Sequence, residues 1–403
     1  MTTERPTRKP SVGLTLFVCL FAGQAALIAV SPVLPEVASD FGVSIATAGQ
    51  LRSVSGLAAG LVALALGAAA ARLGLRDLLL LGLGVLAAGS LLSSAAPSFG
   101  VLVAAQVAVG GGLALVLSGG LAAAAAWTTD ERRAPVLSWA LVGQPGAWIV
   151  GMPVVGLLGG VSWRLGWLVV PFAASVVALV AVGRRPAEVA SEEGRGTWLL
   201  LRRNPKVAGW ALGELLAFSA WAGTLVFAGA LLVESYSASP GAAGVLLGLA
   251  AVAYLPGNFI ARRWIGEWSR VLLILLPLVA AVLAALLGSY RPSLWVSAVV
   301  LSVLAFISAG RTIAGSALGL ELCSMRRIFA MRIRAAAAQF GYLLGAVLGG
   351  LALARWGYAG MGATFGVLFL LAAIPHAAAW AAGRRLAQPI PKAAQGRRSE
   401  IGH

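Results

Sequence analysis

Residues 207–233 of the chain have the sequence VAGWALGELLAFSAWAGTLVFAGALLV, an apolar run interrupted by a single ionisable side chain, Glu214. A helix needs about 20 predominantly apolar residues to cross the hydrocarbon core of a bilayer, and this run is longer than that. Similar runs recur along all 403 residues, of which 60% are hydrophobic and only 11% charged. Soluble domains carry about 25% charged residues. The sequence therefore predicts an all-α polytopic membrane protein.

The apolar runs predict about twelve membrane-spanning helices. Their approximate limits are 12–34, 46–70, 78–96, 100–127, 136–160, 165–183, 207–233, 240–261, 271–289, 294–319, 333–354 and 359–382. The longest polar stretch between spans lies in the middle of the chain and is interpreted as a cytoplasmic linker. The resulting organisation is an N-terminal six-helix bundle (1–183), the linker (184–206), a C-terminal six-helix bundle (207–383) and a cytoplasmic tail (384–403).

The two halves of the chain repeat each other. When the sequence is shifted by about 195 residues, many residues meet a matching residue in the other half, as in duplicated transporters. The matched pairs include Pro10 with Pro205, Phe41 with Tyr236, Ser44 with Ser239, Ala48 with Ala243, Gly49 with Gly244, Leu51 with Leu246, Gln144 with Gln339 and Gly146 with Gly341. This common offset predicts two pseudo-symmetric bundles with a binding site between them near the midplane.

The net charge of +16 is distributed as short basic clusters in alternate loops. The clusters are Arg5 to Lys9, Arg72 and Arg76, Arg132 and Arg133, Arg184 to Lys206, Arg262 to Arg270, Arg326 to Arg334, and Arg384 to Arg398. Such alternation is an orientation signal rather than a nucleic-acid surface, so the lipid bilayer is the expected partner and both termini are expected in the cytoplasm. The high usage of Ala, Gly, Leu and Arg is typical of a GC-rich bacterium, which predicts the inner membrane.

Four stretches of the sequence resemble the major facilitator superfamily. They are SPVLPEVASDFGVS (31–44), GAAAARLGLRD (67–77), QVAVGGG (106–112) and GQPGAWIVGMPVVGLLGGVSWR (143–164). The last is similar to the fifth-span signature of exporters and favours the bacterial twelve-span drug–proton antiporter group, which includes sugar, nucleoside and multidrug exporters. The resemblance implies a loop that takes part in conformational change, here Gly67, Arg72, Gly74 and Arg76.

The sequence departs from the family pattern at positions that bear on proton coupling. Ala71 stands where the loop signature has an acidic residue, and Gln106 stands where the fourth-span signature has an arginine. The first span lacks the carboxylate that many drug exporters keep there. Proton coupling therefore cannot be carried over from motifs in the first half.

Glu214 is one of the few ionisable residues inside a predicted span. A charge at the centre of a span costs roughly 2.5–3.5 kcal/mol on insertion scales, so it usually faces the protein interior or a water-filled cavity. The helical period places Glu214 on one face with the rings of Trp210 and Phe218, and the resemblance implies that this span lines the cavity. Burial disfavours the charged form of an unpaired carboxyl group, which makes Glu214 the candidate proton carrier. The alternative is a structural salt bridge or a polar helix contact.

Arg311, in the predicted tenth span, is the second candidate for proton coupling. It lies about 15 Å along its helix from the inner boundary, so a flexible side chain can reach Glu214. Opening such a pair would couple protonation to substrate binding. The sequence leaves this contact open, because Arg311 can instead bond backbone carbonyls or Ser308.

Other polar and aromatic residues inside the spans are candidates for the substrate cavity, each with interhelical packing as the alternative. They are Gln24, Gln106, Gln144, Trp148, Phe218, Trp221, Tyr254, Asn258, Gln339 and Tyr342. A further arginine, Arg52, follows the start of the second span. It is expected near the outer surface, where it reaches the headgroups or pairs with Glu36 or Asp40.

The sequence thus predicts a monomeric secondary active transporter that works by alternating access. The favoured activity is proton-coupled export of a small, partly apolar organic compound. The alternative is an importer, or an organic-anion carrier with Arg311 as its anion site. Cys19 and Cys323 lie apart, and neither a metal-ligand cluster nor a Ser/His/Asp set is visible, so no disulfide, metal, cofactor or enzyme activity is expected.

Overall fold

The computed structural model describes residues 11–69, 73–185, 204–264, 268–323 and 327–386. These residues are almost entirely helical, with no strand among them. Within them, eleven helical segments are long and apolar enough to cross a membrane. The last segment, Ala330–Ala378, is a pair of crossings, because the chain turns at Gly357 with a φ of 63° that a residue without a Cβ adopts freely. The prediction of about twelve spans in an all-α membrane fold is confirmed.

The N-terminal half contains six crossings. The first is α1 (Val12–Ile28), which continues through a 3-10 turn (Ser31–Val33) into α2 (Leu34–Asp40); the next are α3 (Ile45–Ala69), α4 (Leu75–Ala95) and α5 (Phe99–Ala126). The last two are α6 (Asp130–Gly146) with α7 (Met152–Gly159), and α8 (Trp163–Trp167) with α9 (Ala173–Gly183). Wide π-turns at Ala147–Gly151 and Leu168–Phe172 join these two pairs. Pro153 and Pro171 lack the N–H that a regular helix requires, which explains the widened turns.

The C-terminal half repeats this plan. It consists of α11 (Pro205–Tyr236), α12 (Pro240–Ala261) with a 3-10 turn (Arg262–Trp264), α13 (Ser269–Ser289), α14 (Leu294–Leu322) and the two crossings of α15 (Arg327–Leu386). Asn204 and Ser239 cap α11 and α12 ahead of a proline in the first turn, which is a strong helix start. The predicted helix limits agree within about six residues, and the largest differences are the end of α2 at Asp40, the start of α6 at Asp130 and the start of α15 at Arg327. Arg334, which the sequence placed both in a basic cluster and at the start of the predicted span 333–354, therefore lies two turns inside a helix.

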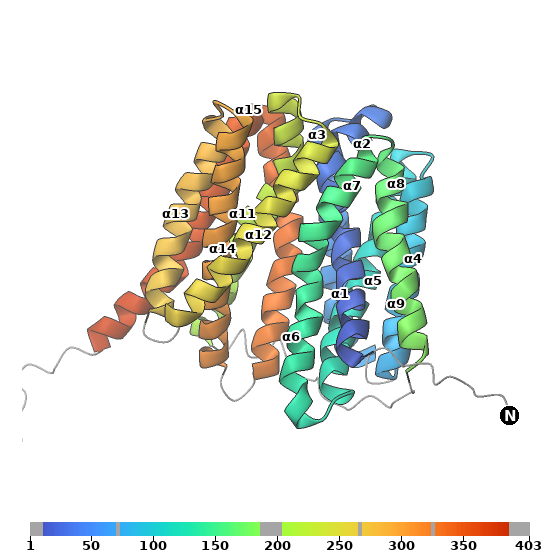
Figure 1. The fold of residues 1–403 in the computed structure, drawn as a ribbon. Helices are drawn as coiled ribbons and strands as arrows, with labels where there is room; N and C mark the ends of the chain where they lie inside the picture. The colour runs from blue at the N-terminus through green and yellow to red at the C-terminus, as the bar shows by residue number, and fades with distance from the viewer. Residues whose placement is uncertain (1–10, 70–72, 186–203, 265–267, 324–326, 387–403) are drawn as a thin grey trace, which may run out of the picture.

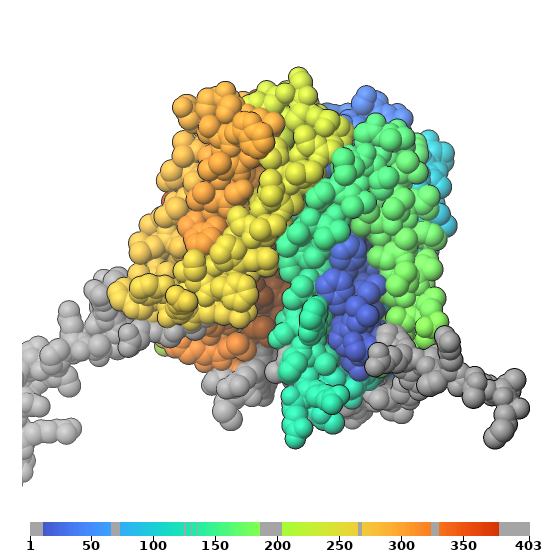
Figure 2. Space-filling model, in the orientation of Figure 1, coloured from blue at the N-terminus to red at the C-terminus, as the bar shows by residue number. Residues whose placement is uncertain are grey.

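The two halves lie side by side (Figure 1). We call the end that carries α2 and the start of α3 the upper end, and the end where α1 begins and α9 finishes the lower end. The ribbons of the two halves converge at the upper end and diverge toward the lower end. In the space-filling view, the surface between α6 and α12 is hollowed in its lower part, and atoms of the first crossing of α15 are visible behind the opening (Figure 2).

Close backbone contacts join the halves in their upper parts. α7 packs on α12, where a Cβ built on Gly156 would lie 3.0 Å from the Gly244 Cα. Small residues of this kind let membrane helices approach closely. α3 packs on α15, where Gln50 Nε2 donates to the Ala346 carbonyl at 3.0 Å. Because these residues lie in the last turns of α7 and the first turns of α3 and α12, the junction closes the upper end.

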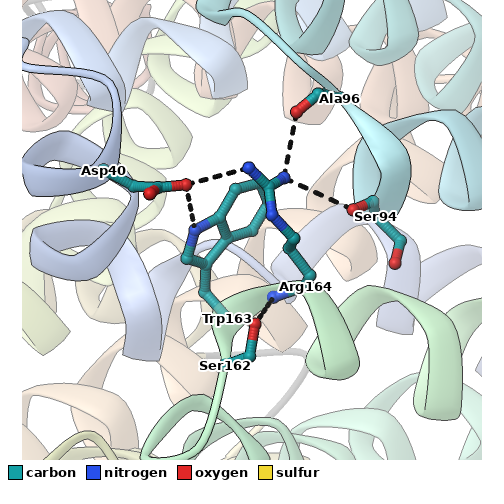
Figure 3. Close-up of polar contacts among 6 residues, drawn as sticks. All are labelled: Asp40, Ser94, Ala96, Ser162, Trp163 and Arg164. Carbon is teal, nitrogen blue, oxygen red and sulfur yellow. Dashed lines mark hydrogen bonds and ion pairs between the residues drawn. The ribbon is translucent and has the colours of Figure 1, made fainter.

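A polar cluster fastens the upper end of the N-terminal half (Figure 3). Asp40 is the last residue of α2. Its Oδ2 accepts hydrogen bonds from Trp163 Nε1 at 3.0 Å and from Arg164 Nη2 at 2.9 Å. Arg164 Nη1 donates to the carbonyl oxygens of Ala96 at 2.9 Å and Ser94 at 3.4 Å, at the end of α4. The Trp-Arg pair that ends the 143–164 stretch therefore ties three helix ends together.

We expect Asp40→Ala to lower the free energy of unfolding by about 1–2 kcal/mol, because the donors on Trp163 and Arg164 lose their shared acceptor. Thermal unfolding of the purified protein in detergent measures this. Glu321→Ala is the matched control, since Glu321 is similarly exposed but has one described partner, Arg270, in an exposed pair of the kind that contributes about 0–1 kcal/mol. Equal melting temperatures for the two variants would show that the cluster does not stabilise the fold.

Candidate functional site

The helix that carries Glu214 is enclosed by other helices along most of its length. In the most apolar 18-residue stretch of α11, 78% of the residues are buried, compared with 39% in the corresponding stretch of the neighbouring span Pro240–Trp264. Glu214 lies in the third turn from the lower end and its side chain is fully buried. The carboxylate is therefore in the protein interior, as the cost of a lipid-facing charge requires.

Two glycines of α14 make room for the face of α11 that carries Glu214. A Cβ on Gly315 would collide with the Glu214 carboxylate, and a Cβ on Gly319 would collide with the ring of Trp210. Trp210 Nε1 donates to the Gly315 carbonyl at 2.8 Å, which satisfies its buried N–H. Trp210 is thus a packing residue that fixes α11 against α14 and sets the position of the carboxylate.

Glu214 lies between two guanidinium groups. Oε1 pairs with Arg311 Nη2 on α14, a contact that the sequence left open. Oε2 lies 3.6 Å from Arg334 Nε on the first crossing of α15, and it has no hydrogen-bond partner among the described residues. One carboxylate thus joins three helices of the C-terminal half. Its protonation would change the electrostatic attraction between all three.

An aromatic wall continues from this ion cluster. The ring of Phe218, one turn above Glu214, lies 5.6 Å from the Arg311 guanidinium carbon and 5.4 Å from that of Arg334. Farther along, the rings of Trp221 and Tyr254 stack with centroids 6.2 Å apart. These half-buried rings supply apolar surface beside charged groups, which is the mixed character that small-molecule sites show.

Sequence reasoning missed two residues of this cluster. Arg334 was counted with a basic cluster at the very start of the predicted span 333–354, although the absence of Gly and Pro between residues 327 and 334 was a signal that the helix begins earlier. His376, on the second crossing of α15, was not among the predicted site residues. Its Nε2 in fact lies 2.6 Å from the position of a Cβ on Gly213, and it is close enough to Arg311 for their charges to interact.

A second arginine site corrects the expectation for Arg52. Its side chain is only 1% exposed, so it neither reaches headgroups nor lies at the surface. Asp40 is engaged by Arg164, and Arg52 instead lies over the ring of Tyr342, with its guanidinium carbon 4.3 Å from the ring centroid. Snorkelling fails here because the second turn of α3 packs against the other half of the molecule.

Four of the predicted cavity residues lie near this second site or beside it. Gln24 of α1 is buried and contacts Tyr342, and Gln339 is buried one turn below Tyr342 on α15. Tyr254 interacts electrostatically with both Tyr342 and Arg334, one residue from each arginine site.

Gln106 is hydrogen-bonded inside the N-terminal half. It is 1% exposed, and its Nε2 donates to Ser93 Oγ at 3.0 Å, which joins α5 to α4 inside the N-terminal half. This is the interhelical hydrogen bond that was the alternative to a cavity role. Gln144, Trp148 and Asn258 are half-buried on α6, the following π-turn and α12 respectively.

The predicted conformational loop is described only in part, because Arg72 lies outside the described residues. Gly67 belongs to the last turns of α3, and Gly74 immediately precedes α4. Arg76 Nη2 donates to the Gly183 carbonyl at 2.9 Å, which ties the lower end of α4 to the end of α9. Its described contact is therefore within the N-terminal half.

Two helical halves around buried charged and aromatic groups define a polytopic membrane transport protein. Residues 16–229, more than half of the chain, match the family model described as the Major Facilitator Superfamily. The chain belongs to this superfamily, and it is a multi-pass membrane transporter for a small-molecule substrate.

Several bacterial relatives share part of the sequence. The chain is 28% identical over 271 residues to the uncharacterised MFS-type transporter YtbD of Bacillus subtilis (strain 168), which covers 65% of this chain and 67% of that protein. It is 26% identical to the uncharacterised MFS-type transporter YbcL of the same organism over 38% of each chain. It is 35% identical to a chloramphenicol resistance protein of Streptomyces lividans over 42% of each chain. The chain therefore matches well under half of the length of two of these relatives.

Solved transporter structures share the fold over nearly the whole chain. A bacterial homologue of the human lysosomal transporter Spinster, in an inward-facing and occupied conformation, superposes with a TM-score of 0.74 at 15% identity, covering 94% of this chain and 98% of that one. A D-xylose–proton symporter gives a TM-score of 0.73 at 16% identity, covering 91% and 96%. At these identities the likeness concerns the fold alone.

Proposed function

We propose that this transporter is a proton-coupled exporter of a small, partly apolar organic compound, acting as a monomer in the bacterial inner membrane. The observation that carries the proposal is the fully buried carboxylate of Glu214 between Arg311 and Arg334. Buried ionisable groups inside transporter spans are the usual proton relays. The similarity to a chloramphenicol resistance protein supports export.

The ion cluster offers a simple coupling mechanism. When Glu214 is ionised, its charge holds Arg311 of α14 and Arg334 of α15 close to α11. When a proton from outside neutralises Glu214, both attractions weaken, and the three helices can adopt another arrangement. Release of that proton on the inner side restores the cluster. In this proposal the lower end faces the cytoplasm and both chain termini are cytoplasmic, as the basic loops at the lower end favour.

Substrate contacts would come from the aromatic wall. Phe218, Trp221 and Tyr254 provide planar apolar surface between the ion cluster and Tyr342. A partly apolar compound gains free energy by covering these rings, because about 25 cal/mol is released for each Å² of apolar surface removed from water.

The alternative is an importer, or a carrier of organic anions with Arg311 as the anion site. The second guanidinium, Arg334, favours the anion version of this alternative, since one carboxylate does not neutralise two cations. Arg311 itself is occupied by Glu214, so the anion would need a different arginine.

Transport in sealed vesicles under imposed pH gradients of either sign separates these possibilities. For a proton antiporter, we expect substrate to leave the compartment that protons enter. Everted vesicles with an acidic interior should therefore accumulate substrate as protons flow out of them. A symporter accumulates substrate in the direction of proton flow. Transport that responds to neither gradient would exclude proton coupling altogether.

A further inference from the structure

Arg52 is a buried cation without a matching anion among the described residues. Its Nε and Nη1 have no hydrogen-bond partner there. Its guanidinium carbon lies 4.3 Å from the centroid of the Tyr342 ring, and the Tyr342 hydroxyl interacts with it. An isolated buried charge is costly, and such groups in a transporter span usually mark a substrate or ion pathway. The arginine therefore needs a partner that the described residues do not supply.

The surroundings of Arg52 have the features of a binding site at the junction of the two halves. Arg52 comes from α3, Gln24 from α1 and Tyr342 from α15. Gln339 Oε1, on the same face of α15, is likewise buried without a hydrogen-bond partner among the described residues. Just below, a Cβ on Gly56 would lie 2.8 Å from the Gln339 carbonyl, so the two helices meet backbone to backbone. Buried polar atoms without a described hydrogen-bond partner thus lie on both α3 and α15, at the junction of the two halves.

We infer that Arg52 binds the anionic group of the transported compound, which is a small organic carboxylate with an aromatic or otherwise apolar body. A guanidinium with free N–H groups forms charge-assisted hydrogen bonds to a carboxylate, and its planar shape suits that group. The Tyr342 hydroxyl can donate to the same anion. Tyr254, which interacts with Tyr342, and Trp221, which stacks on Tyr254, can cover the apolar body. The inference rests on one part of the proposed function, namely that this chain carries a small organic compound between its halves.

Charge supports an anionic rather than a neutral substrate. The two arginine sites contain the guanidinium groups of Arg52, Arg311 and Arg334, whereas Glu214 is their single described carboxylate. A bound monoanion reduces this excess of positive charge. Because Arg52 and Tyr342 belong to different halves, the anion would also join those halves at the upper junction.

The test is ligand binding without any pH gradient. Purified full-length protein is screened by thermal shift against a panel of aromatic carboxylates, beginning with benzoate, salicylate and naphthoate, each beside its uncharged amide. Binding to the folded state raises the melting temperature.

We expect at least one carboxylate to bind more tightly than its amide. Arg52→Gln should weaken that binding by about 10- to 100-fold, the range for hydrogen bonds to a charged group. Arg52→Lys should keep the preference for carboxylate over amide, and the exposed Arg270→Gln should behave as wild type.

Stability without ligand separates a binding role from a structural one. Arg52→Met removes an unpaired buried charge, so the ligand-free variant should melt at or above the wild-type temperature. A clear drop would assign Arg52 to holding Tyr342 and would overturn the inference. So would a panel in which no carboxylate binds better than its amide, or an Arg52→Gln protein that keeps the discrimination. Proton coupling is tested independently, because Glu214→Gln should retain carboxylate discrimination in this assay whether or not Glu214 carries the proton.

Discussion

Glu214→Gln is expected to abolish the accumulation of substrate that a pH gradient drives, while exchange of substrate across the membrane stays intact. One pH unit corresponds to about 1.4 kcal/mol, so a carrier that exchanges one proton for one substrate molecule reaches about a tenfold concentration ratio. A glutamine cannot take up and release this proton, so the ratio should fall to about one. Reconstituted vesicles with an imposed gradient of one pH unit measure both values.

The amide is the informative substitution at this position. Removing one partner of a buried ion pair costs about 3–5 kcal/mol, because the other charge is left uncompensated. Glutamine retains an oxygen that can accept a hydrogen bond from Arg311, so the loss of folding stability is limited. Counterflow, in which unlabelled substrate drives labelled substrate without a gradient, reports whether the carrier is intact. Glu321→Gln is the control, since Glu321 is an exposed carboxylate at the lower end of α14. An unchanged accumulation ratio in Glu214→Gln would refute the assignment of Glu214 as proton carrier.

Helix positions were predictable because they depend on local composition. Runs of about 20 apolar residues, Ser or Asn before Pro, and glycine at turns fix where a membrane helix begins and ends. The same reasoning found Glu214 and Arg311, because a charge inside an apolar run is visible in the sequence. It placed Phe218 on the same face as Glu214 through the helical period alone.

The partners of these residues were not predictable, because they depend on packing between distant segments. Arg334 resembles the basic residues of its neighbouring loop, and only the extended helix α15 brings it to Glu214. Arg52 stands near the predicted end of a span, where snorkelling is the usual outcome; the close packing of α3 on α15 prevents this. Gln106 stands where the family resemblance implied an arginine, and it donates a hydrogen bond to Ser93 that joins α5 to α4. Polarity in a span can be seen in a sequence, whereas the group it meets cannot.

The sequence GMPVVG at residues 151–156 has a physical role that the resemblance alone did not explain. Its last glycine, Gly156, lies against Gly244 and the Pro240 carbonyl, so that α7 and α12 touch through their backbones. In the proposed alternating access, this junction would close in one state and open in the other. The tightness of the contact would then set the balance between the two states.

Gly156→Val is accordingly expected to shift the transporter toward the state with an open upper end and to reduce transport. Overpacking of a tight contact costs about 1–3 kcal/mol, which corresponds to a 5- to 150-fold change in the equilibrium between the two states. Spin labels at Thr47 on α3 and Arg355 on α15, both exposed at the upper end, report the separation of the halves in a background without native cysteines. The distance distribution should move to longer values, and Gly244→Val should act in the same direction because it fills the same contact from the other half. Gly84→Val is the matched control, since no atom lies within 4 Å of a Cβ at Gly84. If Gly156→Val and Gly84→Val give the same distances and the same transport rates, the α7–α12 contact does not control the conformational equilibrium.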